Sequence, residues 1–499
     1  MTHRVVLPGA SIGERAAASI ADPEMQRALR NLDQRLYTAR AVEEHHADLK
    51  DRVAEIRRET LADLDGWLDR LQATLESLGA VVHRASTPAE ASAIVLGIAY
   101  REDVRRVVKS KSMATEEIDL ADVLEGAGIE VVESDLGEYI VQVAGERPSH
   151  MITPAIHKTL EQIAAVLSAE AGEPLPVERE ALTAWTRDHL RRRFLEADMG
   201  VTGANFVAAD TGTIVVVTNE GNGRFCTSLP RIQVTVMPVE KVIPRFADLG
   251  VLLPVLTMSA TGQPMSNYLS MITGPRRPGE QDGPEQLHVV FLDHNRRDLL
   301  GTPYEEMLAC IRCGACLNVC PVYRRIGGHA YDAVYSGPMG KILTPLLSAG
   351  AEGGDLPYAS SLCGACTDAC PSRIPLADLL VHLRADLRAG GSPAAPGRRP
   401  DAPIAARATG PRSFRRVGFG LWGRVWASEA GYRASAAAGR AAARLLGKQG
   451  WATRLGRGRR LPGVRGWTAS RDLPLPAARS FRQRWADRAD SAGRPGGLW

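Results

Sequence analysis

The sequence predicts an α/β domain preceded by amphipathic helices and followed by a small, mainly helical, cysteine-rich domain and a basic tail. The chain has 499 residues, and single hydrophobic cores stop growing at about 250–300 residues, so more than one domain is expected. Apolar residues recur every three or four positions between about residues 16 and 78, a period typical of helices. From Val81 onward, short β-rich runs alternate with segments of helical period, and this alternation predicts an α/β domain.

The changes of pattern divide the chain into four segments. We expect strands in VVHRA, IEVVESD, YIVQVA, FVAAD, TIVVVT, IQVTVM and HVVFLD. The segments are an N-terminal helical region at residues 1–79, the α/β domain at 80–302, the cysteine-rich domain at 303–388 and a basic C-terminal region at 389–499. The last begins with RAGGSPAAPGRRPDAPIAARATGPR, which is too rich in proline, glycine and arginine to pack a core and predicts a linker.

The composition predicts a cytoplasmic protein, peripheral to a membrane at most. The N-terminus lacks the basic start, the apolar core and the small-residue cleavage site of a secretory signal. The longest apolar stretch, LGVLLPVLTM from Leu249, contains a proline and is far shorter than the roughly 20 residues that cross a bilayer. Of the 8 cysteines, 7 lie between Cys310 and Cys370, which favours a metal site in a reducing compartment.

The C-terminal region is strongly basic. Residues 401–499 hold 20 Arg or Lys against 5 Asp or Glu, a net charge of +15, which leaves −11 for residues 1–400 of the total of +4. Trp422 and Trp426 lie among arginines and suggest an amphipathic surface for a partner or an anionic membrane, with a disordered solubilising tail as the alternative. Nucleic-acid binding is not expected, because these basic residues belong to no recognised DNA- or RNA-binding module.

Two cysteine motifs carry the clearest chemistry. CIRCGACLNVCP is a complete C-x2-C-x2-C-x3-C-P run, typical of bacterial iron–sulfur proteins, and it supplies Cys310, Cys313, Cys316 and Cys320. SSLCGACTDACP repeats this pattern with Cys363, Cys366 and Cys370. In the second motif Ser360 stands where the first cysteine is expected.

The order of the cysteines predicts two clusters with exchanged ligands. In two-cluster ferredoxins the fourth cysteine of each run binds the other cluster. One cluster is therefore expected at Cys310, Cys313, Cys316 and Cys370, and the other at Cys320, Cys363 and Cys366. Three thiolates can hold a [4Fe-4S] cluster with a non-cysteine fourth ligand or a [3Fe-4S] cluster, and the pattern leaves both open. A structural zinc site, which closes tetrahedrally on four ligands, fits the complete first run less well.

Ser360 and Cys226 each have a structural interpretation. The Ser360 hydroxyl is suited to capping a backbone amide at a loop or helix start, and the alternative is a direct bond to iron. Cys226 is the cysteine outside the two motifs. A lone cysteine is usually a small buried apolar residue, and the alternative is that Cys226 supplies the missing ligand.

The run TGTIVVVTNEGNGR, residues 211–224, is the other notable motif. A β-rich stretch ending in N-E-G-N-G indicates a strand that enters a turn, with glycines at positive φ. The functional alternative is a glycine-rich loop in which Glu220, Asn222 and Arg224 face a ligand. Neither a dinucleotide-binding G-x-G-x-x-G after a strand nor a Walker-type phosphate loop is present.

Together these motifs resemble the lactate utilization protein B family of bacterial iron–sulfur proteins. The similarity lies in CIRCGACLNVCPVYRRIGGHAY, YSGPMG and LPYASSLCGACTDACPSRIPL, while TGTIVVVTNEGNGR and SLPRI resemble the family's α/β LUD domain. It spans most of residues 1–390 and continues with less specificity into the basic region. The resemblance implies a LUD domain similar in fold to sugar-phosphate isomerases and CoA-transferases, and a second [4Fe-4S] cluster with three cysteine ligands.

The resemblance also implies a role in oxidising L-lactate to pyruvate, in a complex with a cysteine-rich partner and a second LUD-type protein. Because the chain lacks a recognisable flavin or nicotinamide motif, we expect an electron-transfer subunit that is not catalytic alone. The alternative function is a small-molecule transferase or isomerase, in which Glu220 reacts and the clusters are structural.

Overall fold

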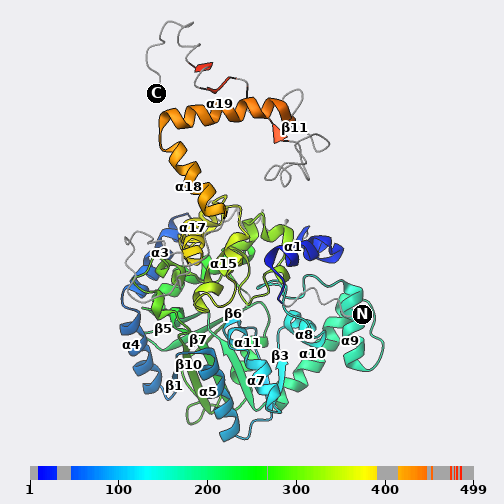
Figure 1. The fold of residues 1–499 in the computed structure, drawn as a ribbon. Helices are drawn as coiled ribbons and strands as arrows, with labels where there is room; N and C mark the ends of the chain where they lie inside the picture. The colour runs from blue at the N-terminus through cyan, green and yellow to red at the C-terminus, as the bar shows by residue number, and fades with distance from the viewer. Residues whose placement is uncertain are drawn as a thin grey trace. The chain divides into compact units, whose positions relative to one another are not determined.

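The structure is a computed structural model, which describes residues 9–30, 47–263, 265–266, 268–389, 414–446, 451–452, 473–474, 477, 479–481 and 484–485. The contacts divide the chain into two units, residues 1–407 and residues 408–499. Figure 1 shows the helices and strands of the two units, coloured by residue number from the N-terminus to the C-terminus. The finer boundaries at residues 79, 302 and 388 remain predictions.

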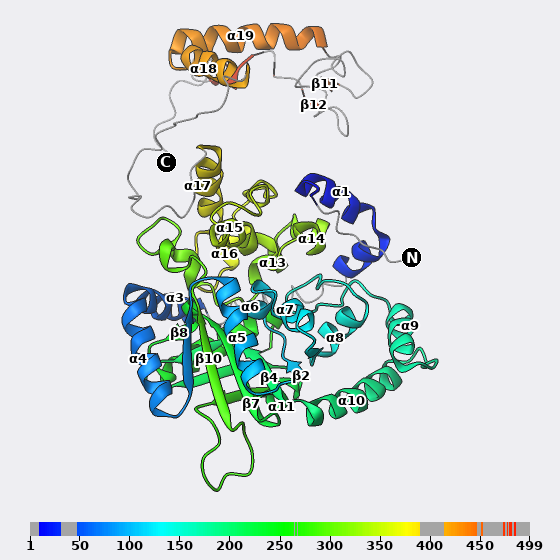
Figure 2. The same cartoon turned by 60° about the horizontal axis from the view of Figure 1, so that its bottom comes forward.

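A six-stranded parallel sheet forms the centre of the first unit (Figure 2). Its order is β1-β10-β7-β4-β2-β3, and every neighbouring pair is parallel. The strands are β1 (Val81–Ala85), β2 (Arg106–Lys109), β3 (Glu130–Glu133), β4 (Met199–Gly203), β7 (Ile232–Pro238) and β10 (Gln286–Leu292). All seven residues of β7 are buried, as expected for a strand covered on both faces.

Alternating residues of the sheet join different hydrophobic cores. On β10, Val290 and Leu292 pack with helix α5 (Pro88–Arg101), whereas Leu287, Val289 and Phe291 pack with α4 (Leu64–Ser77). This follows from the two-residue period of a strand, which sends successive side chains to opposite faces. The other helices of this region are α6 (Met113–Glu117), α7 (Leu120–Gly126), α8 (Leu136–Val143), α9 (Leu160–Ala171), α10 (Arg179–Glu196) and α11 (Asn222–Ser228).

A smaller sheet of four strands lies beside the first, in the order β8-β5-β6-β9. Its strands are β5 (Phe206–Ala208), β6 (Thr213–Thr218), β8 (Val242–Ile243) and β9 (Tyr268–Ile272). Helices α3 (Ala47–Ala62) and α12 (Leu249–Thr261) pack with it through one hydrophobic core. The same core includes Ile311 and Cys313, so the small sheet and the first cysteine motif are packed together.

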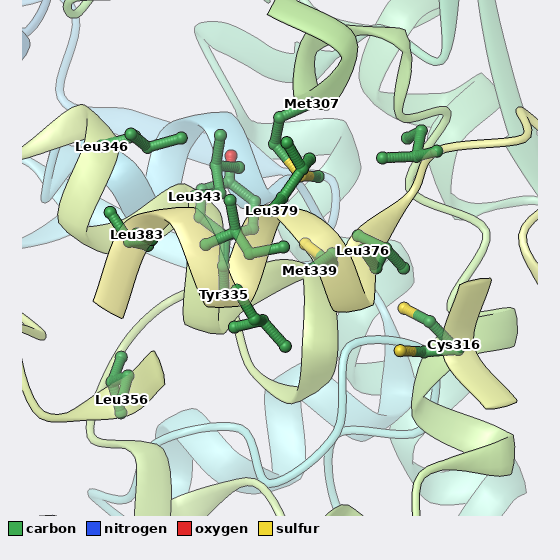
Figure 3. Packing of buried hydrophobic residues seen from close by; sticks show 14 of the residues in the cluster. Met307, Cys316, Tyr335, Met339, Leu343, Leu346, Leu356, Leu376, Leu379 and Leu383 are labelled. Carbon is green, nitrogen blue, oxygen red and sulfur yellow. The ribbon is translucent and has the colours of Figure 1, made fainter. Parts of the chain in front are cut away.

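The cysteine-rich segment is mainly helical, as expected. It contains α13 (Ala315–Val319), α14 (Tyr323–Ile326), α15 (Gly337–Leu347), α16 (Ala365–Ala369) and α17 (Leu376–Ala389). Figure 3 shows leucine and methionine side chains of α15 and α17 packed together, with Cys316 nearby. Helix α1 (Ile12–Ala21) packs on this segment, because Arg15 Nε donates to the Ala330 carbonyl at 2.8 Å and Ser19 bonds the Ile326 carbonyl.

Two local predictions are wrong. YIVQVA lies in helix α8 and not in a strand, because Asp135 accepts hydrogen bonds from the amides of Gly137 and Glu138 and so starts a helix there. Gly221 and Gly223 do not take positive φ. They start helix α11, and a Cβ on Gly223 would lie 2.8 Å from Thr218 Cγ2. Glycine is therefore needed for close packing of this helix against β6.

The second unit contains helices α18 (Phe414–Trp426) and α19 (Glu429–Leu446) and a short antiparallel pair, β11 (Trp451–Ala452) and β12 (Leu473–Pro474). Leu421, Trp422 and Trp426 are exposed, and the rings of Trp422 and Trp426 lie 4.7 Å apart. Most of the predicted linker lies outside the described residues. Within the part of the chain that the structure describes, no helix is long and apolar enough to cross a membrane.

Candidate functional site

The two cysteine motifs adopt the same backbone conformation. Arg312 and Leu362, which occupy equivalent positions, have φ values of +61° and +55°. Gly314 and Gly364 follow at +79° and +83°, and each precedes a five-residue helix, α13 or α16. A non-glycine residue at positive φ is uncommon, so its occurrence in both motifs marks a structural repeat. In this repeat Ser360 corresponds to Cys310.

Four cysteines from both motifs line one small cavity. This first cysteine set consists of Cys310, Cys313, Cys316 and Cys370. Burial, and then the neighbouring thiols, raise the pKa of Cys316 well above its ordinary value, and burial raises that of Cys370 to about 12. Among the described residues, no three His, Cys, Asp or Glu side chains form a group suited to a single metal ion. Buried thiols around a cavity fit an iron–sulfur cluster, whose iron ions stabilise thiolates.

A buried ionic network fixes the first cysteine loop to the sheet. Arg312 Nη2 donates to Glu240 Oε1 at 2.8 Å, and its guanidinium lies 5.0 Å from the Tyr335 ring centroid. Arg296 bonds both carboxylate oxygens of Glu117 at 2.7 Å and also contacts Glu240 Oε2 at 2.7 Å. Removing one partner of such a buried pair typically costs about 3–5 kcal/mol. The network therefore sets the position of the cysteine loop.

The second cysteine set consists of Cys320, Cys363 and Cys366. Cys320 and Cys366 are buried in the core of the cysteine-rich segment, whereas Cys363 is exposed. The fully buried Lys341 points its Nζ at Cys320 Sγ, 3.6 Å away. A hydrogen bond from the Ala365 amide lowers the pKa of Cys363. A cation and an amide donor are the groups that stabilise thiolates, so this set also fits a cluster.

Ser360 acts as a backbone cap, as its first interpretation predicts. Its Oγ accepts a hydrogen bond from the Leu362 amide at 3.2 Å, and its carbonyl accepts one from Arg384 Nη2 at 2.9 Å. Cys226 is fully buried in the core around α9 and α10, and burial raises its pKa to about 12. Cys226 is therefore a small buried residue, as expected. It packs in a different hydrophobic core from Cys320 and Cys366 of the second cysteine set.

A large cavity, here called the sheet-end cavity, lies where strands β2, β3, β4 and β7 end. It measures about 610 Å³, and its wall includes Lys111, Asp135, Asn205 and Lys241, which follow these strands. Ligands of open α/β sheets bind outside the carboxyl ends of the strands. Arg312 and Cys313 line both this cavity and the small cavity of the first cysteine set.

The structure separates the three candidates from the glycine-rich run. Glu220 and Asn222 line the sheet-end cavity, whereas Arg224 is exposed and is not part of its wall. Burial, followed by the charge of Asp135, raises the pKa of Glu220. The sequence analysis missed Lys111 and Lys241. Lys111 lies two residues after the end of β2 and Lys241 three residues after the end of β7, and this position beyond a parallel strand is the signal that could have identified them.

Comparisons with known proteins agree with these features. A family model for the LUD domain matches residues 68–292, and one for a 4Fe-4S dicluster domain matches residues 306–374. The dicluster match implies two iron–sulfur clusters. The parallel α/β domain is thus a LUD domain, followed by a helical dicluster domain.

Several curated relatives match most of the chain. Lactate utilization protein B of Bacillus velezensis is 45% identical over 383 residues, covering 76% of this chain and 80% of that protein. The protein of the same name from Bacillus pumilus is 41% identical over 474 residues, covering 94% and 95%. The uncharacterized electron transport protein YkgF of Escherichia coli is 45% identical over 374 residues, covering 74% and 79%. The chain therefore belongs to the lactate utilization protein B family.

Proposed function

We propose that this chain is the iron–sulfur electron-transfer subunit of a complex that oxidises L-lactate to pyruvate. The observation that carries the proposal is the position of Cys370, which supports an exchange of ligands between the two motifs. Cys370 of the second motif lines the cavity of the first set, and helices α13 and α16 of the two motifs are in contact. Two clusters held by these residues would lie close to each other, as an electron relay requires.

The chain's own residues have three tasks in this function. The first set holds one cluster through four thiolates, and the second set holds the other through Cys320, Cys363 and Cys366. The clusters, when bound, accept and release single electrons. Met339 and Leu376, labelled with Cys316 in Figure 3, line the cavity of the first set and reduce its contact with water. Arg312 and Lys341 place positive charge beside the thiolates, which favours the more negative, reduced state.

Lactate oxidation releases two electrons and two protons, and this chain carries no recognisable flavin or nicotinamide motif. The proposal therefore includes partner subunits, a cysteine-rich protein and a second LUD-type protein. Relatives named for lactate utilization and for electron transport support this assignment.

The proposal is tested by anaerobic co-purification of the chain with the products of neighbouring genes, followed by dye reduction with L-lactate. We expect dye reduction by the complex and its loss when Cys313→Ser replaces a proposed ligand. Cys226→Ser is the matched control, because it makes the same chemical change at a buried cysteine outside both sets. Equal rates of dye reduction by the native and the Cys313→Ser complexes would contradict electron transfer through the first cluster.

A second function is supported by the sheet-end cavity. Glu220 lines this cavity, and its raised pKa would suit a reacting carboxylate. In this alternative the LUD domain is a transferase or isomerase and the clusters are structural. Turnover of a small molecule by this chain alone, retained after Cys313→Ser and lost after Glu220→Gln, would favour it.

A further inference from the structure

The sheet-end cavity holds polar groups that the electron relay does not use. Lys241 lines it, and only 8% of this residue is exposed. Among the described residues its ammonium group has no hydrogen-bond or ion-pair partner. Burial, and then the charge of Arg312, lower the pKa of Lys241 to about 7 although Glu240 opposes this shift, because a buried ammonium group without a partner is costly.

The nearby acids compensate Lys241 only in part. Glu240, its neighbour in sequence, is bound to Arg296 and Arg312 at 2.7 and 2.8 Å. Of the acids in the cavity wall, Glu220 is influenced by the charges of Asp135 and Lys111, and Lys111 itself forms an ion pair with Glu138 at 3.4 Å. Because Glu240 is shared between two arginines, its charge does not fully offset Arg312 and Lys241, which both line the wall, and an anion would be stabilised beside them.

Three buried side-chain atoms of the wall lack hydrogen-bond partners: the hydroxyl oxygen of Thr153, the side-chain carbonyl oxygen of Asn222, and Lys111 Nζ, which has only its ion pair with Glu138. Buried polar atoms are nearly always hydrogen-bonded. Thr153 and Asn222 belong to the same wall as Lys241, and a few polar groups of this kind orient a ligand in a binding pocket.

The remaining wall is largely apolar, and its volume suits an organic molecule. Met151, Ile152, Leu136 and Leu256 are among the lining residues. A cavity of about 610 Å³ lies within the roughly 300–1,000 Å³ range of small-molecule sites.

We propose that the sheet-end cavity binds an organic anion, with its carboxylate or phosphate group at Lys241 and its body against the apolar wall. Because Cys313 lines both cavities, this ligand lies against the loop that holds the first cysteine set. Two sources share this chemistry: a small 2-hydroxy or 2-oxo acid, and a phosphorylated redox cofactor of flavin mononucleotide size. The choice of a 2-hydroxy or 2-oxo acid rests on the proposed function. The proposal that the cavity binds an anion does not depend on that function.

The test is titration calorimetry of the anaerobically purified holoprotein with three probes: L-lactate, pyruvate and flavin mononucleotide. We expect one of the two classes to bind. Lys241→Met should weaken that binding by roughly tenfold or more, because a charge-assisted hydrogen bond is lost. Lys241→Arg should keep it within a few-fold. Lys158→Met is the matched control, since it removes a half-buried lysine that neither lines the cavity nor contacts a cysteine set.

Thr153→Val keeps the test decisive if Lys241→Met does not fold. It removes a hydroxyl that has no protein partner, so the melting temperature should not fall, while binding should weaken roughly two- to tenfold. Absence of binding by all three probes, or binding unchanged in both the Lys241→Met and the Thr153→Val proteins, would overturn the proposal. The dye-reduction result with partners is independent of this outcome, so failure of the anion site and failure of the relay are distinguishable.

Discussion

Single side chains explain why the two cysteine sets differ. The first set has four buried or half-buried thiols, with Arg312 beside them. The second set has three, of which Cys363 is exposed, and its corresponding fourth position is the hydroxyl of Ser360. Because iron–sulfur clusters are held best by soft thiolate ligands, we infer that the second site is the more labile of the two.

Replacing Ser360 with Cys should supply the absent thiolate. We expect the second cluster of the native protein to convert between [4Fe-4S] and [3Fe-4S] on mild oxidation, and Ser360→Cys to suppress this conversion and lower that cluster's potential by adding negative charge. Electron paramagnetic resonance of the oxidised protein measures the [3Fe-4S] signal. The account would be contradicted by a signal that stays undiminished in Ser360→Cys, or that is lost only when Cys310 is replaced. Either result would show that the position without a cysteine ligand does not belong to the second cluster.

Replacing Cys370 should damage the first cluster although this residue lies in the second motif. Cys370→Ser and Cys366→Ser should each reduce the iron content from about eight to about four per chain, but the spectrum that remains should differ. We expect the [3Fe-4S] signal to persist in Cys370→Ser and to vanish in Cys366→Ser. The same surviving signal in both variants would refute the exchanged ligand sets.

At the level of elements, the sequence predicts helices and strands well where the pattern of apolar and polar side chains determines the structure. Strands β1, β3, β5, β6, β7 and β10 were expected from their β-rich runs, and the repeat of the cysteine motifs was visible in their spacing. The prediction of a strand in YIVQVA is wrong because its apolar residues suit a strand or a helix. The N-terminal cap at Asp135 favours the helix. Strands β2, β4, β8 and β9 were missed. Without β2 and β4, the positions of Lys111 and Asn205 after parallel strands were not recognised.

The contact between β1 and β10 should make stability depend on pH. His83 Nε2 lies 3.1 Å from His288 Nδ1, and burial lowers the pKa of His288 to about 4. Since the folded state disfavours the protonated ring, stability is complete above the unfolded pKa of about 6.5 and declines as pH falls towards 4. Thermal melts should show a smaller acid-induced loss in His288→Gln than in the native protein. Equal losses would exclude this pair as a cause.

Helix α18 should contribute a surface for an anionic membrane. Trp422 and Trp426 are exposed on it and Arg424 lies between them, the combination that binds headgroups. Replacing both tryptophans with serine should weaken co-sedimentation with vesicles containing phosphatidylserine by roughly tenfold. Replacing the exposed Phe481 and Trp485 instead is the matched control. If deletion of residues 400–499 leaves vesicle binding and complex assembly unchanged, the region docks neither to the membrane nor to a partner subunit.

At the scale of the whole molecule, the LUD domain and the two cysteine motifs work as one packed unit. The core of the small sheet contains Ile311 and Cys313, and the network around Glu240 joins the sheet to the first cysteine loop. The sequence separates these parts by long stretches, so their contact was not predictable from pattern. It places the sheet-end cavity directly beside the first cysteine set.

The most direct test of the central claim is electron paramagnetic resonance of the anaerobic holoprotein mixed with L-lactate, with and without its co-purified partners. If the chain is an electron relay and not the lactate-oxidising site, lactate alone should leave its clusters oxidised, and addition of the partners should produce the signals of reduced clusters. Reduction of the isolated chain by lactate, or clusters that stay oxidised while the complete complex forms pyruvate, would contradict the relay.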